Sequence, residues 1–172
     1  MNENALQTLE YGKIKDQLAS YALSKGARKL VEELHPSLNI SVIEERALET
    51  TEARRIIDVN PSIPLSAMED MDEVLVKLRK GAILNPAELG RIGDLLGSVK
   101  RLRKFMNSME STAPSVSSYA ASMYECQDLR EEIERCINLE QVSDHASSEL
   151  GRIRKKMLAV EPPTILIPEV TA

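Results

Sequence analysis

The sequence of 172 residues has no tryptophan, one phenylalanine and four tyrosines, so aromatic residues make up only 3% of it. Hydrophobic residues still amount to 42%, and a core therefore has to be built from leucine, isoleucine, valine, alanine and methionine. That list suits packed helices better than a β-sandwich, whose strands favour aromatic side chains. At this length we expect one domain with a core of its own, or somewhat more.

Cysteine is also scarce, since only Cys126 and Cys136 occur. They lie in a segment with helical periodicity, which would hold them about 15 Å apart and exclude a disulfide. The two histidines, His35 and His145, are distant in sequence, which makes this a poor metal-site pattern. We expect two buried or half-buried thiols and no metal ligands.

Long apolar runs are absent as well. No run approaches the roughly 20 apolar residues that cross a bilayer, and the opening residues, Met1 to Asn4, do not resemble a signal peptide. We therefore expect no membrane partner and a cytoplasmic location. The formal net charge of -5 argues against nucleic-acid binding by the whole surface, although it leaves room for a local basic face.

The clearest helix signal begins at Asn85. Asn85 can cap a helix, Pro86 suits its first position, and Glu88 can reach back to the amide of residue 85, which together form a capping box. From there to Met109, apolar residues recur every three or four positions, which predicts one helix about 36 Å long. We expect the rest of the chain to pack around it.

Three glycines, Gly90, Gly93 and Gly97, interrupt this predicted helix. Each lowers helix propensity relative to alanine by up to about 1 kcal/mol, so close approach of a neighbouring backbone is the expected compensation. Their spacing predicts neither a phosphate loop nor a dinucleotide site, because no strand precedes them and no Lys-Ser/Thr pair follows.

The same periodicity predicts further helices on both sides, and therefore an all-α multi-helix bundle. The expected elements are two helical pieces over 4–34 with weak points at Gly12 and 24–26; a stop at His35–Pro36; a helix over 41–58 with a Ser41–Glu44 capping box; a short helix from 70 or 71 to 80 ended by Gly81; a weak helix over 115–122; a helix over 125–138; a turn or short hairpin over 139–144; and a last helix from 146 or 147, cut short by Pro162–Pro163.

Two basic groups could contact phosphates of a nucleic acid. A solvated helix face is the alternative in each case, and it is favoured for the first group, while the two interpretations are balanced for the second. No aromatic residue accompanies them except Phe105, which belongs to an apolar stripe. The first group is Lys100, Arg101, Arg103 and Lys104, and the second is Arg152, Arg154, Lys155 and Lys156.

No catalytic constellation emerges from the remaining polar residues. Ser143, Asp144 and His145 are consecutive and cannot converge on one point as a catalytic triad must. Asp144 and Ser147 are better interpreted as caps of the last helix. Paired glutamates such as 131–132 and 32–33 lie on charged helices with no sign of a cleft. The sequence therefore predicts no catalytic, cofactor-binding or metal-binding residue.

Five segments carry a family pattern in a fixed order. They are 8–19, with Leu-Glu, an aromatic residue, lysine and Gln-Leu; 33–37, Glu-Leu-His-Pro-Ser; 49–56, with Thr-Glu-Ala-Arg-Arg; 81–88, Gly-x-Leu-x-Pro-x-Glu in outline; and 144–154, Asp-x-Ala-Ser-x-x-Leu-x-x-Ile-Arg in outline. In this order they resemble the N-terminal region of the bacterial MutS-like proteins of the second kind, the recombination-suppressing paralogue of the mismatch-repair ATPase MutS. The resemblance extends from about residue 4 to about residue 158.

The resemblance implies a place within a larger DNA-binding machine. Family members act on branched DNA and on stalled ribosomes, bind ATP with magnesium, carry a C-terminal Smr-type endonuclease domain, and form homodimers chiefly through the ATPase part. The implied roles are DNA repair, suppression of recombination and ribosome quality control. Because these 172 residues hold no P-loop, the resemblance places no cofactor and no active site here. It implies a helical core and lever base that passes movement between a DNA clamp and the nucleotide site.

Some residues depart from the family pattern. Residues 63–68 and 139–142 stand where the family has glycine-containing steps, and residues 161–164 break a helix that continues in the family as a lever. This predicts a core domain over 1–145, the start of a truncated lever helix over 146–161, and a non-helical tail over 162–172. The chain would then be either a cut-out piece or a truncated gene product.

One alternative belongs to a different functional class. Met106, Met109 and Met123 could line a groove that binds a partner helix, because flexible methionine side chains adapt to such partners. The chain would then be a stand-alone helical adaptor.

Overall fold

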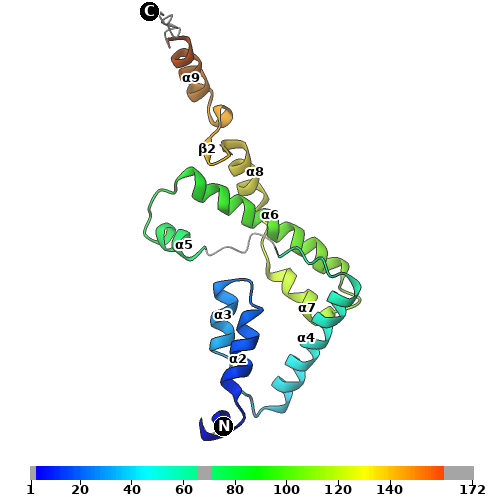
Figure 1. Cartoon of the computed structure of the whole chain (residues 1–172). Coiled ribbons are helices and arrows are strands. Elements are labelled where there is room, and N and C mark those ends of the chain that lie inside the picture. Colours follow the sequence, from blue (N-terminus) through cyan, green and yellow to red (C-terminus); the bar gives the residue numbers. More distant parts are fainter. Residues whose placement is uncertain (1–2, 66–70, 161–172) are drawn as a thin grey trace, which may run out of the picture.

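The computed structural model describes residues 3–65 and 71–160, which form nine α-helices, two 3₁₀ turns and one two-stranded sheet. The prediction of an all-α fold is therefore confirmed. Figure 1 shows the helices following an open, elongated path from α1 (Glu3–Thr8) at one end to α9 (Ser148–Val160) at the other. Within this part of the chain the buried apolar side chains are Ile56, Val74, Leu102, Ala113, Ala120 and Ile133.

Helix α6 (Pro86–Ser108) is the element on which the middle of the chain packs. The predicted capping box is present, since Asn85 Oδ1 accepts the Glu88 amide at 2.9 Å and Glu88 Oε2 accepts the Asn85 amide at 2.9 Å. Lys77 also donates to Glu88, and this bond, with the Asn85 amide, lowers the pKa of Glu88. The box thus ties α5 (Asp72–Arg79) to the start of α6.

Two of the three glycines in α6 lie against a crossing segment, but isoleucine side chains approach them, and not the backbone that the sequence predicted. A Cβ at Gly93 would lie 3.1 Å from Ile133 Cγ2, and one at Gly90 would lie 3.9 Å from Ile137 Cγ2. Both side chains come from the segment that crosses α6, so these glycines allow close approach. At Gly97 the nearest atom is Arg101 Nη1 of the same helix, at 3.5 Å. The packing prediction is therefore wrong for Gly97.

The N-terminal segment contains three helices where two were predicted: α1, α2 (Tyr11–Ser20) and α3 (Lys25–Glu32). The break falls at Glu10, whose φ of 52° is left-handed, just before the predicted weak point at Gly12. Ser24 caps α3 by accepting the Ala27 amide at 3.1 Å. Helices α2 and α3 pack together, and α3 ends before His35–Pro36 as predicted.

Helix α4 (Ile40–Val59) starts one residue earlier than predicted. Asn39 is its cap, accepting the Ser41 amide at 3.0 Å, so the predicted Ser41–Glu44 capping box is wrong. Glu52, only 2% exposed, accepts the amide of Val116 at 2.9 Å and so satisfies a donor in the first turn of α7 (Pro114–Ser118).

A 3₁₀ turn, η1 (Tyr119–Ser122), follows α7 directly, which confirms the predicted weak helix. The Tyr119 hydroxyl donates to Glu49 of α4, and this bond raises the pKa of Tyr119. Gly81 has φ +69° just after α5, the left-handed position predicted for it.

The C-terminal part runs through α8 (Gln127–Cys136), a hairpin of β1 (Ile137–Asn138) and β2 (Gln141–Val142), and a 3₁₀ turn, η2 (Asp144–Ala146), into α9. The hairpin is antiparallel, with Ile137 opposite Val142, which confirms the predicted short hairpin. Helix α9 begins one residue after the later predicted start. The predicted stop at Pro162–Pro163 and the tail over 162–172 lie outside the described residues.

The cysteine prediction is half right. Cys136 ends α8 and is half-buried, as expected. Cys126 precedes α8 with a left-handed φ of 41° and is exposed, so its predicted burial in a helix is wrong. Its left-handed backbone makes Cys126 the residue before the first turn of α8 and not a residue within the helix.

Candidate nucleic-acid interface

The first basic group lies on the C-terminal half of α6, and the structure engages two of its four members. Arg103 Nη1 donates to Glu125 Oε1 at 3.2 Å, and Arg101 Nη2 donates to Ser98 Oγ at 2.8 Å. Lys100 and Lys104 are exposed and make no ion pair within residues 3–65 and 71–160. Two lysines one turn apart thus remain available for a phosphate.

The second basic group lies on α9, where Arg154 differs from the others. Its Nη1 donates to the carbonyl of Val142 at 2.7 Å and to the carboxylate of Asp144. Arg154 therefore fastens α9 to the hairpin. The carboxylate of Asp144 is thus an acceptor for Arg154. Ser147 accepts the Leu150 amide at 3.1 Å and so caps α9, as predicted.

The other three basic residues of α9, Arg152, Lys155 and Lys156, surround one cleft between η2 and α9. All three are exposed and make no ion pair in the part of the chain that the structure describes. The cleft has a volume of about 470 Å³. Its other walls are Asp144, His145, Ser148 and Gly151.

The cleft can accept an anionic group. Three cations face it, while its one carboxylate, Asp144, is already paired with Arg154. Ser148 adds a hydroxyl donor, and His145 adds a ring nitrogen that can donate to an oxygen. Phosphate oxygens are the acceptors that such a set of donors fits best.

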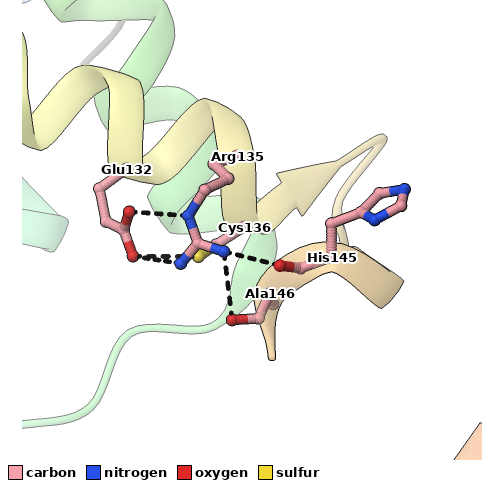
Figure 2. Close-up of polar contacts among 5 residues, drawn as sticks. All are labelled: Glu132, Arg135, Cys136, His145 and Ala146. Carbon is pink, nitrogen blue, oxygen red and sulfur yellow. Dashed lines mark hydrogen bonds and ion pairs between the residues drawn. The ribbon is translucent and has the colours of Figure 1, made fainter. Parts of the chain in front are cut away.

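Arg135 holds this cleft in place from α8 (Figure 2). Its Nη1 donates to the carbonyl of His145 at 2.6 Å and to that of Ala146 at 3.3 Å. Its Nε and Nη2 donate to the two carboxylate oxygens of Glu132 at 2.9 and 2.5 Å. Since the same guanidinium contacts α8 and η2, it fixes the turn from which α9 starts.

The carboxylate of Glu132 and the guanidinium of Arg135 stabilise each other's charge. The bond from Arg135 is the main reason that the pKa of Glu132 is lowered to about 2, and a bond from Cys136 Sγ at 3.5 Å adds to it. In return, Glu132 raises the pKa of Arg135. Partial burial, followed by the bond to Glu132, raises the pKa of the Cys136 thiol. A raised pKa disfavours the nucleophilic thiolate form of Cys136.

Comparison with known proteins finds relatives of this chain. No family model matches the sequence. Endonuclease MutS2 of Clostridium botulinum is 34% identical over 160 residues, which are 91% of this chain and 20% of that protein. Endonuclease MutS2 of Symbiobacterium thermophilum is 31% identical over 158 residues, again 91% of this chain. The putative endonuclease MutS2 of Bacillus subtilis is 30% identical over 165 residues, 94% of this chain and 21% of its own length.

The chain is a MutS2-like N-terminal region. It spans about a fifth of the length of the curated relatives that it matches. The family resemblance seen in five short segments is therefore confirmed by similarity along nine tenths of the chain. The helical framework described above is the form that this MutS2-like sequence takes.

The structure sorts the eight predicted contact residues of this MutS2-like region into two kinds. Arg101, Arg103 and Arg154 bond to neighbouring side chains or backbone. The remaining five, Lys100, Lys104, Arg152, Lys155 and Lys156, are exposed. The two groups lie on different helices, and Figure 1 shows α9 projecting away from α6.

Sequence reasoning missed three residues of the candidate interface, namely His145, Ser148 and Arg135. No sequence pattern assigned His145 or Ser148 to a binding site, because their place in the cleft depends on how η2 meets α9. Arg135 gave a weak signal, since it follows Glu132 by one helical turn, but its bonds to His145 and Ala146 cross between elements. No local pattern marks such contacts.

Three other kinds of site would serve metal ions, membranes or partner helices. Among residues 3–65 and 71–160, no three His, Cys, Asp or Glu side chains are placed to hold a metal ion. Of the helices described, none is both long and apolar enough to span a bilayer. The three methionines of the adaptor hypothesis, Met106, Met109 and Met123, are half-buried, and that hypothesis stays a prediction.

Proposed function

We propose that this chain is a helical section of a MutS2-type protein that holds a nucleic-acid-facing helix, α9, in a fixed orientation. The observation that carries the proposal is the position of Arg152, Lys155 and Lys156, which surround one cleft directly after a turn fastened by Arg135 and Arg154. Three cations that make no ion pair with any residue the structure describes can contact phosphates at the base of a fastened helix, and α9 itself can pass movement along its length.

The wider activities belong to the full-length protein in this proposal. Its relatives bear the name endonuclease MutS2, and we propose action on branched DNA or on ribosomes in the cytoplasm, in DNA repair, recombination control and ribosome quality control. ATP and magnesium would serve the full-length protein as a homodimer. The 172 residues hold no Gly-Lys-Ser/Thr phosphate loop, so no step of that chemistry is assigned to them.

Binding of a branched DNA junction by the 172-residue chain tests the proposal. We expect weak binding at low salt whose logarithm falls linearly with the logarithm of salt concentration. Replacing Arg152, Lys155 and Lys156 together with glutamine should reduce the slope by about 2 to 3, because each phosphate contact contributes about 0.9.

A matched control removes the same charge elsewhere. Arg54, Arg55 and Lys80 are exposed, make no ion pair within the described residues, and lie on α4 and after α5. Their joint replacement with glutamine should leave the salt slope near that of the unmodified chain. No binding at low salt, or equal slopes for the two triple variants, would overturn the proposal.

A further inference from the structure

A second cleft adjoins the one surrounded by Arg152, Lys155 and Lys156. We call the first the cationic cleft and the second the hairpin cleft, whose volume is about 300 Å³. The walls of the hairpin cleft come from β1, β2, η2 and α9. The two clefts share Asp144 and His145 of η2 as lining residues. A ligand that extends past η2 can therefore occupy both.

The two clefts differ in charge. The cationic cleft has three cations that make no ion pair with any residue the structure describes. In the hairpin cleft the one guanidinium, Arg154, is bonded to the one carboxylate, Asp144. The other polar side chains of the hairpin cleft are two amides, a hydroxyl and an imidazole. A phosphate therefore fits the cationic cleft, whereas a neutral group with hydrogen-bond donors and acceptors fits the hairpin cleft.

The two amides of the hairpin cleft come from facing positions of the hairpin. Leu139 and Glu140 form its two-residue turn, with φ of 44° and 62°, and Asn138 lies opposite Gln141. Facing residues of antiparallel strands project from the same side. Both residues are exposed, and neither side chain has a hydrogen-bond partner within residues 3–65 and 71–160. Each amide offers a donor beside an acceptor, the pattern that matches the edge of a nucleobase.

The imidazole of His145 belongs to the residue that lines both clefts. Its backbone is held from two sides, because the amide donates to Ser143 Oγ at 3.2 Å and the carbonyl accepts from Arg135 Nη1 at 2.6 Å. Figure 2 shows the ring pointing away from Arg135 and Glu132. His145 is exposed, and its ring has no hydrogen-bond partner in the part of the chain that the structure describes. An open aromatic ring on a fixed backbone is a surface on which a base can stack.

We propose that the hairpin cleft binds the base of an unpaired DNA nucleotide whose phosphate lies in the cationic cleft. The base stacks on the ring of His145, and its edge faces the amides of Asn138 and Gln141. In a duplex the faces of a base are stacked and its Watson–Crick edge is paired, so only an unpaired nucleotide offers both. This inference rests on the proposed function, because the cationic cleft supplies the phosphate contact, and it adds which part of a branched DNA the chain selects.

Strands with and without bases test this inference. A short oligothymidylate and an abasic strand of equal length carry the same phosphates and differ only in their bases. By fluorescence anisotropy at low salt, the unmodified chain should bind the oligothymidylate about fivefold or more tightly than the abasic strand. A DNA junction with unpaired thymidines at its branch point should likewise bind more tightly than the fully paired junction.

Variants of the hairpin cleft separate base binding from phosphate binding. Joint replacement of Asn138, Gln141 and His145 with alanine should abolish the preference for bases and leave the salt slope unchanged, because the cationic cleft is intact. His145→Phe alone should keep the preference, since a ring remains for stacking. The control is Gln17→Ala with Asn107→Ala, two exposed amides that do not line the hairpin cleft. It should bind both strands as the unmodified chain does.

The outcomes distinguish this inference from the proposed function. Equal affinity of the unmodified chain for the two strands, with a salt slope that still depends on Arg152, Lys155 and Lys156, would overturn the inference and leave the proposed function standing. A preference for bases that survives the triple alanine variant would also overturn it, because the bases would then be bound elsewhere. A salt slope that does not depend on the three cations would overturn the proposed function, and this inference with it.

Discussion

Arg135 of α8 donates to the backbone carbonyl of His145 at 2.6 Å and thereby fixes the turn from which α9 starts. The same side chain is oriented by Glu132, one helical turn before it. From the other side, Arg154 of α9 donates to the carbonyl of Val142 in the hairpin. Two arginines thus fasten α9 from opposite ends of a short hairpin and turn.

Removing the first of these side chains should loosen the turn. Arg135→Met keeps the aliphatic part of the side chain but leaves the carbonyls of His145 and Ala146 without this donor. We expect faster hydrogen exchange of amides in η2 and the first turn of α9, with the amides of α6 unchanged. Arg55→Met, at an exposed residue of α4, is the control. Equal hydrogen-exchange rates in η2 for Arg135→Met and Arg55→Met would show that the bonds from Arg135 do not hold the turn.

The lowered pKa of Glu132 sets the pH range in which its carboxylate can orient Arg135. Its folded pKa of about 2 lies below the unfolded value near 4.5, so its stabilisation is complete above about 4.5 and is lost as pH falls toward 2. An NMR titration of the Glu132 carboxyl should give a midpoint near 2, and in Arg135→Met the midpoint should rise toward 4.5. A midpoint near 4.5 in the unmodified chain would contradict the bond.

The two kinds of glycine in α6 should respond differently to substitution. Gly93→Leu places atoms against Ile133 and should lower the free energy of unfolding by about 1–3 kcal/mol, as overpacking does. Gly97→Ala meets only the flexible end of Arg101 and should raise it by up to about 1 kcal/mol through helix propensity. Urea unfolding measures both. A neutral Gly93→Leu would mean that α8 does not pack there.

The start of α6 offers a test of local helix chemistry. Asn85→Ala removes the acceptor of the Glu88 amide and should lower the free energy of unfolding by about 1 kcal/mol. Asn107→Ala, at an exposed position in the last turn of the same helix, should change it by less than about 0.5 kcal/mol. If urea unfolding gave the two variants equal stabilities, the cap would contribute nothing.

Local signals in the sequence determined much of this fold. The Asn85–Glu88 box, the left-handed Gly81 and the Ser147 cap each depend on residues within one turn, and each is found where the pattern predicts it. The cap of α4 was misplaced because Asn39 competes with Ser41 for the same role, and the extended backbone at Asn39 decides the outcome.

Contacts between distant segments could not be predicted in the same way. Glu52 is buried because it satisfies the Val116 amide, 64 positions later in the chain. Nothing in the charged pattern around Glu52 distinguishes it from its solvated neighbours. The same holds for the candidate interface. The sequence shows the basic residues as clusters, but the bond from Arg103 to Glu125 depends on how α6 meets the segment before α8.

The fixed orientation of α9 can be measured with spin labels on Leu129→Cys of α8 and Leu158→Cys of α9, both at exposed positions. Cys126→Ser and Cys136→Ser would remove the native thiols. Pulsed electron resonance should give a narrow distance distribution for this chain and a broad one once Arg135→Met and Arg154→Met are added. Equally broad distributions with and without the two arginines would contradict a fastened lever base.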